Sequence, residues 1–343
     1  MEPTSLSEEL DERPRLSIVI PVYQSQDCLA ALYMAISEVT ALMNWSYEII
    51  FVNDFSKDDS WLVIESLCEL DRNVIGIDLR RNFGQDNAIL TGLRAAHGKY
   101  IAIMDDDLQH HPKFLPDLLQ EISKGHDVVY ADFREKKQKL WKNLGSRLNG
   151  KIAEWILDKP KGMYMSPYKI IRREVAEIIC QYPGHAPYVD GLLFQTTARF
   201  SQVPAEHYSR HNGHGNYTFI RSVGVSARLA FSFSARPLRI IGVAGLFFSA
   251  LGLTLAIAVV FYRFLFPSAF GPEAIGWASL MVAILIAAGL QMICFGATAE
   301  YVGRSYLLMS RKPQSTIREI LNCSREPQTR ITSSSLTQTH ESS

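Results

Sequence analysis

One stretch of the sequence, Ile101–Gln109, limits what this chain can fold into more than any other. Four apolar residues are followed directly by three aspartates, and the stretch closes on a leucine and a glutamine. Apolar runs of this length are typical of a strand that is buried in a parallel sheet. Carboxylates that directly follow such a strand lie where open α/β sheets bind their ligands. The alternative is a solvated acidic turn, because aspartate is also common in turns.

The three aspartates, Asp105, Asp106 and Asp107, offer only oxygen ligands. Such ligands suit Mg²⁺ or Mn²⁺ rather than zinc, and a metal of this kind usually also binds phosphate oxygens of the substrate. We therefore expect a metal-assisted site for a phosphorylated ligand. The sequence has no G-x-G-x-x-G motif and no Walker A motif, so the phosphates must be held mainly by the metal.

Strands alternate with helices on both sides of this stretch. The segment 16–23 is predicted to form a strand that stops at Pro21, because proline lacks the N–H that a sheet needs. The apolar patterns predict further strands at residues 47–52, 74–79 and 127–130, and helices at residues 29–43, 61–70 and 86–96. The alternation indicates βαβ units and a mostly parallel sheet. Polar residues follow several of these strands, among them Tyr23 and Asp54. We expect them to gather with the aspartates along one edge of the sheet.

The composition excludes some classes of protein. The 343 residues carry no net charge, so no basic field indicates nucleic-acid binding. The five cysteines lack metal-ligand spacing and are typical of reduced thiols in a cytosolic domain. Residues 1–15 are acidic and polar, without the apolar segment of a signal peptide, and we expect them to be disordered.

Two long uncharged runs occupy the C-terminal third of the chain, at residues 240–262 and 274–299. About 20 mainly apolar residues suffice to span a membrane, so we expect two transmembrane helices within residues 238–304. Buried core helices are the alternative. The basic residues flank the pair of runs rather than the loop between them, which places both ends in the cytosol. The expected order is a cytosolic domain (16–217), an interfacial amphipathic helix (218–237), the two spans, and a largely disordered cytosolic tail (305–343).

Basic and apolar residues are interleaved at helical spacing between residues 134 and 155. Such a helix can be a solvated surface helix, or it can lie with its cationic side on an anionic membrane. Three histidines, His207, His211 and His214, also have helical spacing. Gly213 and Gly215 argue against a helix there, and hence against a histidine metal site.

Four segments resemble glycosyltransferase family 2 in their order and spacing, namely residues 17–23, 52–58, 82–85 and 104–109. The family has the GT-A fold, an α/β, Rossmann-like domain that binds nucleotide-diphosphate sugars. The Asp-x-Asp-Leu-Gln form of the last segment is most similar to the polyprenyl-phosphate glycosyltransferases. These include the dolichol-phosphate mannose synthases, the bactoprenol glucosyltransferases and the undecaprenyl-phosphate aminoarabinose transferases.

The resemblance implies a role for each residue of the acidic motif. Asp105 and Asp107 belong to the family's metal and diphosphate motif, and Gln109 is a third metal ligand for Mg²⁺ or Mn²⁺. Asp105 and Asp107 are therefore the expected catalytic residues, together with Arg134. Asp106 joins the donor-binding group, but it stands where the family commonly has alanine. Its replacement by alanine is accordingly expected to cost little.

The resemblance also implies a donor pocket, in which Asp54 hydrogen-bonds the nucleotide base and Pro21 and Tyr23 form the walls. The sequence departs from the family pattern beside Asp54. Asn53 replaces the first residue of an acidic pair, and Phe55 replaces a glycine.

The resemblance also implies that four cations bind the acceptor phosphate, namely Arg134, Arg147, Lys169 and Arg210. The loop that holds Arg210 can instead lie over the donor diphosphate. Guanidinium groups suit phosphate oxygens, whereas Lys169 stands where the family has arginine and offers a point charge. Pro167 stands where the family often has an aspartate that is a candidate catalytic residue. A phosphate acceptor tolerates this loss, because its dianion is already a nucleophile near neutral pH.

The implied function is metal-dependent, inverting transfer of a sugar from a nucleotide-diphosphate sugar, with UDP favoured, to undecaprenyl phosphate or a similar lipid. The expected setting is a bacterial inner membrane, with a cytoplasmic catalytic domain, a homo-oligomeric assembly and a cell-envelope glycan as the destination. A processive polysaccharide synthase is one alternative, although the chain lacks the Gln-x-x-Arg-Trp motif of such enzymes. A non-catalytic, membrane-anchored scaffold is another, which the departures at Asn53, Pro167 and Asn216 allow.

Overall fold

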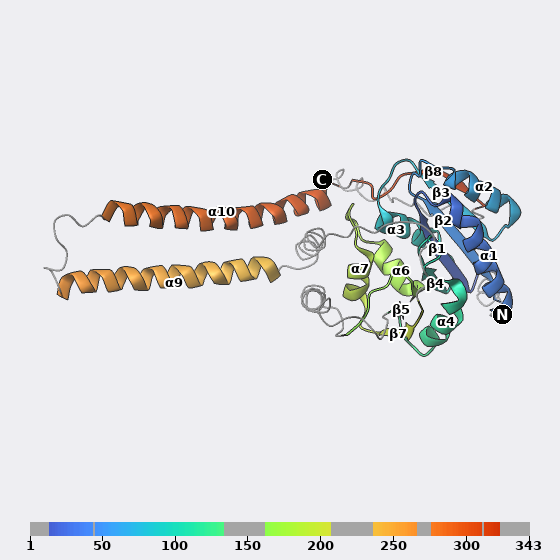
Figure 1. Cartoon of the computed structure of the whole chain (residues 1–343), viewed down its shortest axis with the longest axis horizontal. Helices are drawn as coiled ribbons and strands as arrows, with labels where there is room; N and C mark the ends of the chain where they lie inside the picture. Colours follow the sequence, from blue (N-terminus) through green and yellow to red (C-terminus); the bar gives the residue numbers. More distant parts are fainter. Residues whose placement is uncertain are drawn as a thin grey trace, which may run out of the picture.

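The computed structural model describes residues 14–43, 45–133, 162–206, 236–265, 276–310 and 312–322. Its main body is an α/β domain with helices on both faces of one sheet. Two long helices, α9 (Arg236–Leu265) and α10 (Gly276–Met309), lie side by side and project away from this domain (Figure 1).

The sheet of the described residues has eight strands in the order β7-β5-β6-β4-β1-β2-β3-β8. Neighbours from β4 through β1 and β2 to β3 are parallel, whereas β6 and β8 run antiparallel to their neighbours. The strands are β1 (Leu16–Val22), β2 (Tyr47–Asn53), β3 (Val74–Leu79), β4 (Tyr100–Ile103), β5 (Val128–Asp132), β6 (Lys169–Arg172), β7 (Phe200–Pro204) and β8 (Ile317–Leu321).

Helices cover both faces of the sheet, which explains why its central strands are apolar on both sides. One core cluster joins the sheet to α1 (Gln26–Met43), α2 (Ser60–Leu70), η1 (Pro112–Phe114) and α4 (Leu115–Ser123). The other joins it to α3 (Gln85–Ala95), α6 (Arg173–Cys180) and α7 (Val189–Thr196). Helix α3 approaches the sheet so closely that a Cβ on Gly92 would collide with Val19 of β1.

The predicted βαβ alternation is confirmed for β1 to β4 and for the helices between them. The prediction that the first strand ends at Pro21 is wrong, because β1 stays paired with β2 as far as Val22. Proline is tolerated here for a geometric reason. The pairing of β1 with β4 ends at Val19, and alternate residues of a strand bond to opposite neighbours, so the missing N–H of Pro21 lies on the side where β4 has already ended.

Strand β8 corrects the prediction of a largely disordered tail for residues 317–321. After α10 the chain returns to the domain and adds this strand to the edge of the sheet beside β3 (Figure 1). Ile317 and Ile320 pack against the core on the α3 side. The two residues between these isoleucines are charged and interrupt the apolar pattern, so the strand is not evident from the sequence. Charged residues of this kind are common on edge strands.

Large apolar side chains are exposed along both projecting helices, for example Phe247, Phe261 and Phe264 of α9 and Ile286 and Phe295 of α10. Within the described ranges, no helix is both long and apolar enough to cross a bilayer. The predicted interfacial helix at 218–237 lies outside the described residues, except for its last two positions, which begin α9.

Candidate active site

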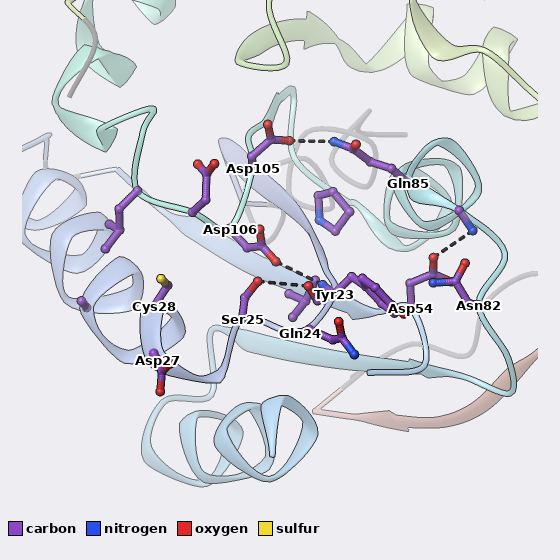
Figure 2. Close-up of a pocket in the computed structure, with 16 residues that line it drawn as sticks. Tyr23, Gln24, Ser25, Asp27, Cys28, Asp54, Asn82, Gln85, Asp105 and Asp106 are labelled. Carbon is purple, nitrogen blue, oxygen red and sulfur yellow. Dashed lines mark hydrogen bonds between the residues drawn. The ribbon is translucent and has the colours of Figure 1, made fainter. Parts of the chain in front are cut away.

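A cleft of about 840 Å³ opens where β1, β2 and β4 end, at the carboxyl edge of the parallel part of the sheet (Figure 2). This is the edge at which open α/β sheets bind ligands. The cleft is lined by Pro21, Val22, Tyr23, Gln24, Ser25, Asp27, Cys28, Ala31, Asp54, Asn82, Gly84, Gln85, Asp105, Asp106, Asp107 and Leu108. The five residues predicted to bind the donor are all among them, and so is Asp107.

The acidic stretch reaches the cleft because the strand before it ends abruptly. Met104 is still fully buried, whereas the three aspartates that follow are partly exposed. Leu108 also lines the cleft and has a left-handed backbone, with φ of 59°, where the chain turns after the aspartates. The backbone N–H of Gln109 donates to Asp107 across this turn over 3.1 Å. Gln109, the third predicted metal ligand, is not among the residues that line the cleft.

Asp105 has the most perturbed carboxyl group of the cleft. Its pKa is raised to about 7. Burial is the largest cause, and the neighbouring charges of Asp107 and Asp106 contribute to the same shift. The side chain of Gln85, at the start of α3, donates to Asp105 over 2.7 Å (Figure 2). His110 Nδ1 lies 3.8 Å from the other Asp105 oxygen. The raised pKa favours the protonated form of Asp105 up to about neutral pH.

This donor set fits a hard divalent cation that also binds substrate. No group of three or more His, Cys, Asp or Glu side chains capable of holding a metal occurs in the described ranges. Mg²⁺, however, is usually bound by only one or two carboxylates together with substrate phosphates. Asp105 and Asp107 supply two such carboxylates, and the raised pKa of Asp105 shows that their charges repel each other.

Asp106 makes a contact that the sequence did not reveal. One of its oxygens accepts a hydrogen bond from the backbone N–H of Tyr23 over 3.1 Å, which ties the end of β4 to the loop after β1 (Figure 2). Burial is the main reason that the pKa of Asp106 is raised. Asp106 therefore shapes the wall of the cleft that Tyr23 forms.

Asp54 holds the loop that precedes α3. Its two oxygens accept the backbone N–H groups of Phe83 and Gly84 over 2.7 and 2.8 Å. Gly84 has φ of 91°, a conformation that side-chain-bearing residues rarely adopt. Burial raises the pKa of Asp54, and the two N–H donors offset part of that effect. Each carboxylate oxygen has a further acceptor position, so a contact between Asp54 and a nucleotide base stays compatible with this geometry.

Lys169, predicted to contact an acceptor phosphate, is only 2% exposed. Its ammonium group is paired with Asp190 of α7, which also accepts a 2.9 Å hydrogen bond from the hydroxyl of Tyr130. The positive charge nevertheless lowers the pKa of Asp105 somewhat. Lys169 is thus placed to act on the cleft by charge rather than by a free ammonium group. The other predicted acceptor residues, Arg134, Arg147 and Arg210, lie outside the described residues.

Sequence reasoning missed several residues of the cleft. Gln85 was part of a segment quoted for its resemblance to a family, but its contact with Asp105 depends on the placement of α3. Gln24 and Ser25 follow Tyr23 in the loop after β1 and line the cleft, although no pattern in the sequence marks them. Asp27 and Cys28 reach the cleft because α1 begins at Gln26, earlier than predicted.

Comparisons with known proteins identify relatives of this chain. The family model described as glycosyl transferase family 2 matches residues 17–179. An undecaprenyl-phosphate 4-deoxy-4-formamido-L-arabinose transferase from Enterobacter sp. (strain 638) is 30% identical over 316 residues, which cover 90% of this chain and 94% of that protein. The protein of the same name from Klebsiella pneumoniae (strain 342) is 28% identical over 321 residues, covering 92% and 95%.

Solved structures that resemble the chain include glucosyl-3-phosphoglycerate synthase from Mycobacterium tuberculosis. Its complex with Mn²⁺, UDP-glucose and phosphoglyceric acid gives a TM-score of 0.45 at 17% identity, covering 67% of this chain and 83% of that one. Its complex with UDP gives a TM-score of 0.45 at 18% identity, covering 67% and 84%.

Two residues beside the cleft, Gln24 and Phe55, have left-handed backbones, with φ of 56° and 59°. Such a conformation costs a residue other than glycine roughly 1–2 kcal/mol. Phe55 stands where the family usually has glycine, and the observed φ gives the physical reason for that preference. Its ring is 44% exposed, so burial of the ring offsets only part of the strain.

Replacement of Phe55 tests this strain directly. Phe55→Gly and Phe55→Ala lose the same ring, but only glycine adopts the left-handed backbone without cost. We expect the glycine variant to have the higher free energy of unfolding, by about 1 kcal/mol, measured by denaturant or thermal unfolding. The exposed helical residue Met34 is the matched control, because there alanine should be the more stable by about 1 kcal/mol. Equal stability of the two Phe55 variants would contradict the assignment of strain.

Proposed function

Because the chain belongs to glycosyl transferase family 2, we propose that it transfers a sugar from a nucleotide-diphosphate sugar to a polyprenyl phosphate such as undecaprenyl phosphate. The chain is a glycosyltransferase with a GT-A fold, related to the polyprenyl-phosphate sugar transferases. One observation carries the proposal. The predicted walls of a base pocket and the carboxylates of a diphosphate–metal motif line the same cleft.

The donor lies in this cleft in our proposal, with its base against Pro21, Tyr23 and Asp54. Asp105 and Asp107, with Gln109, would hold Mg²⁺ or Mn²⁺. When bound, such a metal neutralises charge that develops on the leaving diphosphate. Gln85 would orient Asp105 for this role by donating to one of its oxygens.

The acceptor phosphate attacks the anomeric carbon from the face opposite the diphosphate, which inverts the configuration there. A bond forms between a phosphate oxygen and the anomeric carbon, and the bond to the nucleotide diphosphate breaks. In this proposal the acceptor phosphate is bound by Arg134, Arg147 and Arg210. Lys169 attracts the phosphate by its charge without contacting it directly. Little general-base help is needed, because the attacking phosphate is already ionised. The proline at position 167 is therefore compatible with turnover.

We place the protein at a bacterial inner membrane, with the catalytic domain in the cytoplasm and with α9 and α10 as two spans. The support is the two uncharged runs and the apolar side chains exposed along both helices. This goes beyond what the described ranges show, because no helix in them is both long and apolar enough to cross a bilayer. A homo-oligomer, expected from the family, is part of the same proposal.

The donor is a UDP-sugar in this proposal. The relatives with 28–30% identity are named as formamido-arabinose transferases. UDP-linked 4-deoxy-4-formamido-L-arabinose is therefore the first donor to test, followed by UDP-glucose, and the product is a lipid-phosphate sugar for the cell envelope.

Transfer in vesicles tests the proposed function. We expect the full-length protein, in vesicles that contain undecaprenyl phosphate, to convert one labelled UDP-sugar of a panel into a lipid-linked sugar. Asp107→Ala should lower kcat/KM by about 100-fold or more, because a metal ligand is lost. Asp117→Ala, at an exposed position on α4, is the control and should transfer normally. Equal transfer by Asp107→Ala would refute the metal assignment, whereas a long polymer product would indicate a polysaccharide synthase.

The pKa of Asp105 predicts how metal binding depends on pH. Its value of about 7 exceeds the ordinary 3.8, so the folded protein favours the protonated form, and this stabilising contribution is lost as the pH rises through 7. A metal binds the deprotonated carboxylate and should therefore bind about tenfold more weakly at pH 6 than at pH 8.

The measurement is a Mn²⁺ titration of the thermal unfolding temperature at the two pH values. Asp105→Asn should remove the pH dependence between pH 6 and pH 8, and Asp117→Asn should keep it. A wild-type protein with the same Mn²⁺ affinity at both values would contradict the role of Asp105 as a metal ligand.

A further inference from the structure

The strand that follows α10 is connected to the donor cleft by a chain of polar contacts. We propose that Arg318 of β8 is a positioning residue for the donor cleft, acting through Asp78 and Asn53 on the turn that supports Gln24. This inference rests on the proposed function, because it concerns the cleft that is assigned there to the nucleotide. Arg318 itself lies outside that cleft.

The first contact joins two neighbouring strands at the sheet edge. Asp78 of β3 has a side chain that is only 2% exposed, and Nε of Arg318 lies 2.5 Å from one of its oxygens. A buried carboxylate is costly unless it is paired. The guanidinium group of Arg318 is half exposed, so β8 supplies from the surface the positive charge that this buried anion needs.

The second contact fixes the orientation of an amide. Nδ2 of Asn53 donates to the other oxygen of Asp78 over 2.5 Å. An ionised carboxylate only accepts hydrogen bonds, so it holds the NH₂ side of Asn53 toward itself. The amide oxygen of Asn53 is thereby turned toward the backbone N–H of Ser56, which donates to it over 3.2 Å.

The third contact reaches the cleft wall. The hydroxyl oxygen of Ser56 accepts a hydrogen bond from the backbone N–H of Gln24 over 3.0 Å, and Gln24 lines the cleft. Figure 2 shows Gln24 beside Tyr23 and Ser25 at this wall. Gln24 and Phe55, one on each side of this contact, are both left-handed. Such residues persist only when their surroundings fix them, which is what the contacts from Asp78 through Ser56 provide.

The same contacts explain why asparagine stands at position 53. An acidic residue there would place a second carboxylate against the buried Asp78. The amide of Asn53 instead donates to Asp78 and accepts from Ser56. Asn53 thus differs from the family pattern because its partner on β3 is already an anion that Arg318 neutralises.

The test measures UDP binding with Mn²⁺ by calorimetry on the full-length protein, together with donor KM and kcat. We expect Arg318→Met to raise the Kd for UDP and the donor KM by about tenfold with little change in kcat. Arg318→Lys should bind close to the wild type, because it restores the positive charge. Asp78→Asn should also raise the Kd, and it leaves no unpaired buried charge, so the test holds even if Arg318→Met does not fold. Glu319→Gln, exposed on the same strand, is the control and should bind normally.

The outcomes separate this inference from the proposed function. If Arg318→Met and Asp78→Asn bind UDP as tightly as the wild type, the inference is wrong and the proposed function stands. A fall in kcat with an unchanged KM, or a failure of Arg318→Lys to restore binding, would also overturn it. A wild-type protein that binds no nucleotide would contradict the proposed function, and the inference with it.

Discussion

The crowding of three carboxylates at the end of one buried strand is the constraint on which the cleft depends. Strand β4 is apolar up to Met104 and then exposes Asp105, Asp106 and Asp107 within a single turn. Burial and mutual repulsion hold the pKa of Asp105 near 7, far above its ordinary value. Such a cluster is costly by itself, and a bound cation would offset this cost. The loop after β1 and the start of α3 contact this cluster, through the bonds from Tyr23 to Asp106 and from Gln85 to Asp105.

Much of this arrangement could be predicted from the sequence, because it follows from local patterns. The apolar runs locate β1 to β4, and the polar residues after them, from Tyr23 to Asp107, fall at one edge of the sheet for topological reasons. Contacts between distant segments could not be predicted. The pairing of Lys169 with Asp190, the bond from Gln85 to Asp105 and the return of β8 to the sheet each depend on tertiary placement.

Departures from the family pattern become understandable once the backbone is known. Phe55 occupies a left-handed position where glycine would carry no strain, and Asn53 faces a buried aspartate that an acidic residue would repel. Asn53 ends β2, Phe55 follows two residues later, and the hydroxyl of the next residue, Ser56, accepts a hydrogen bond from Gln24 at the cleft wall. This segment therefore contains the strained Phe55, and it is connected through Asp78 to Arg318 of β8, the strand that follows the projecting helices. A segment near the end of the sequence is thus connected to the cleft wall by polar contacts.

The account depends most on the claim that the acidic edge of the cleft binds a nucleotide diphosphate through a metal. Equilibrium binding of UDP to the purified full-length protein, measured with Mn²⁺ and again with excess EDTA, tests this claim without any assumption about the sugar or the lipid acceptor. We predict saturable binding with Mn²⁺ and at least about tenfold weaker binding with EDTA, because the carboxylates then repel the diphosphate. Equal affinity under the two conditions would contradict the account.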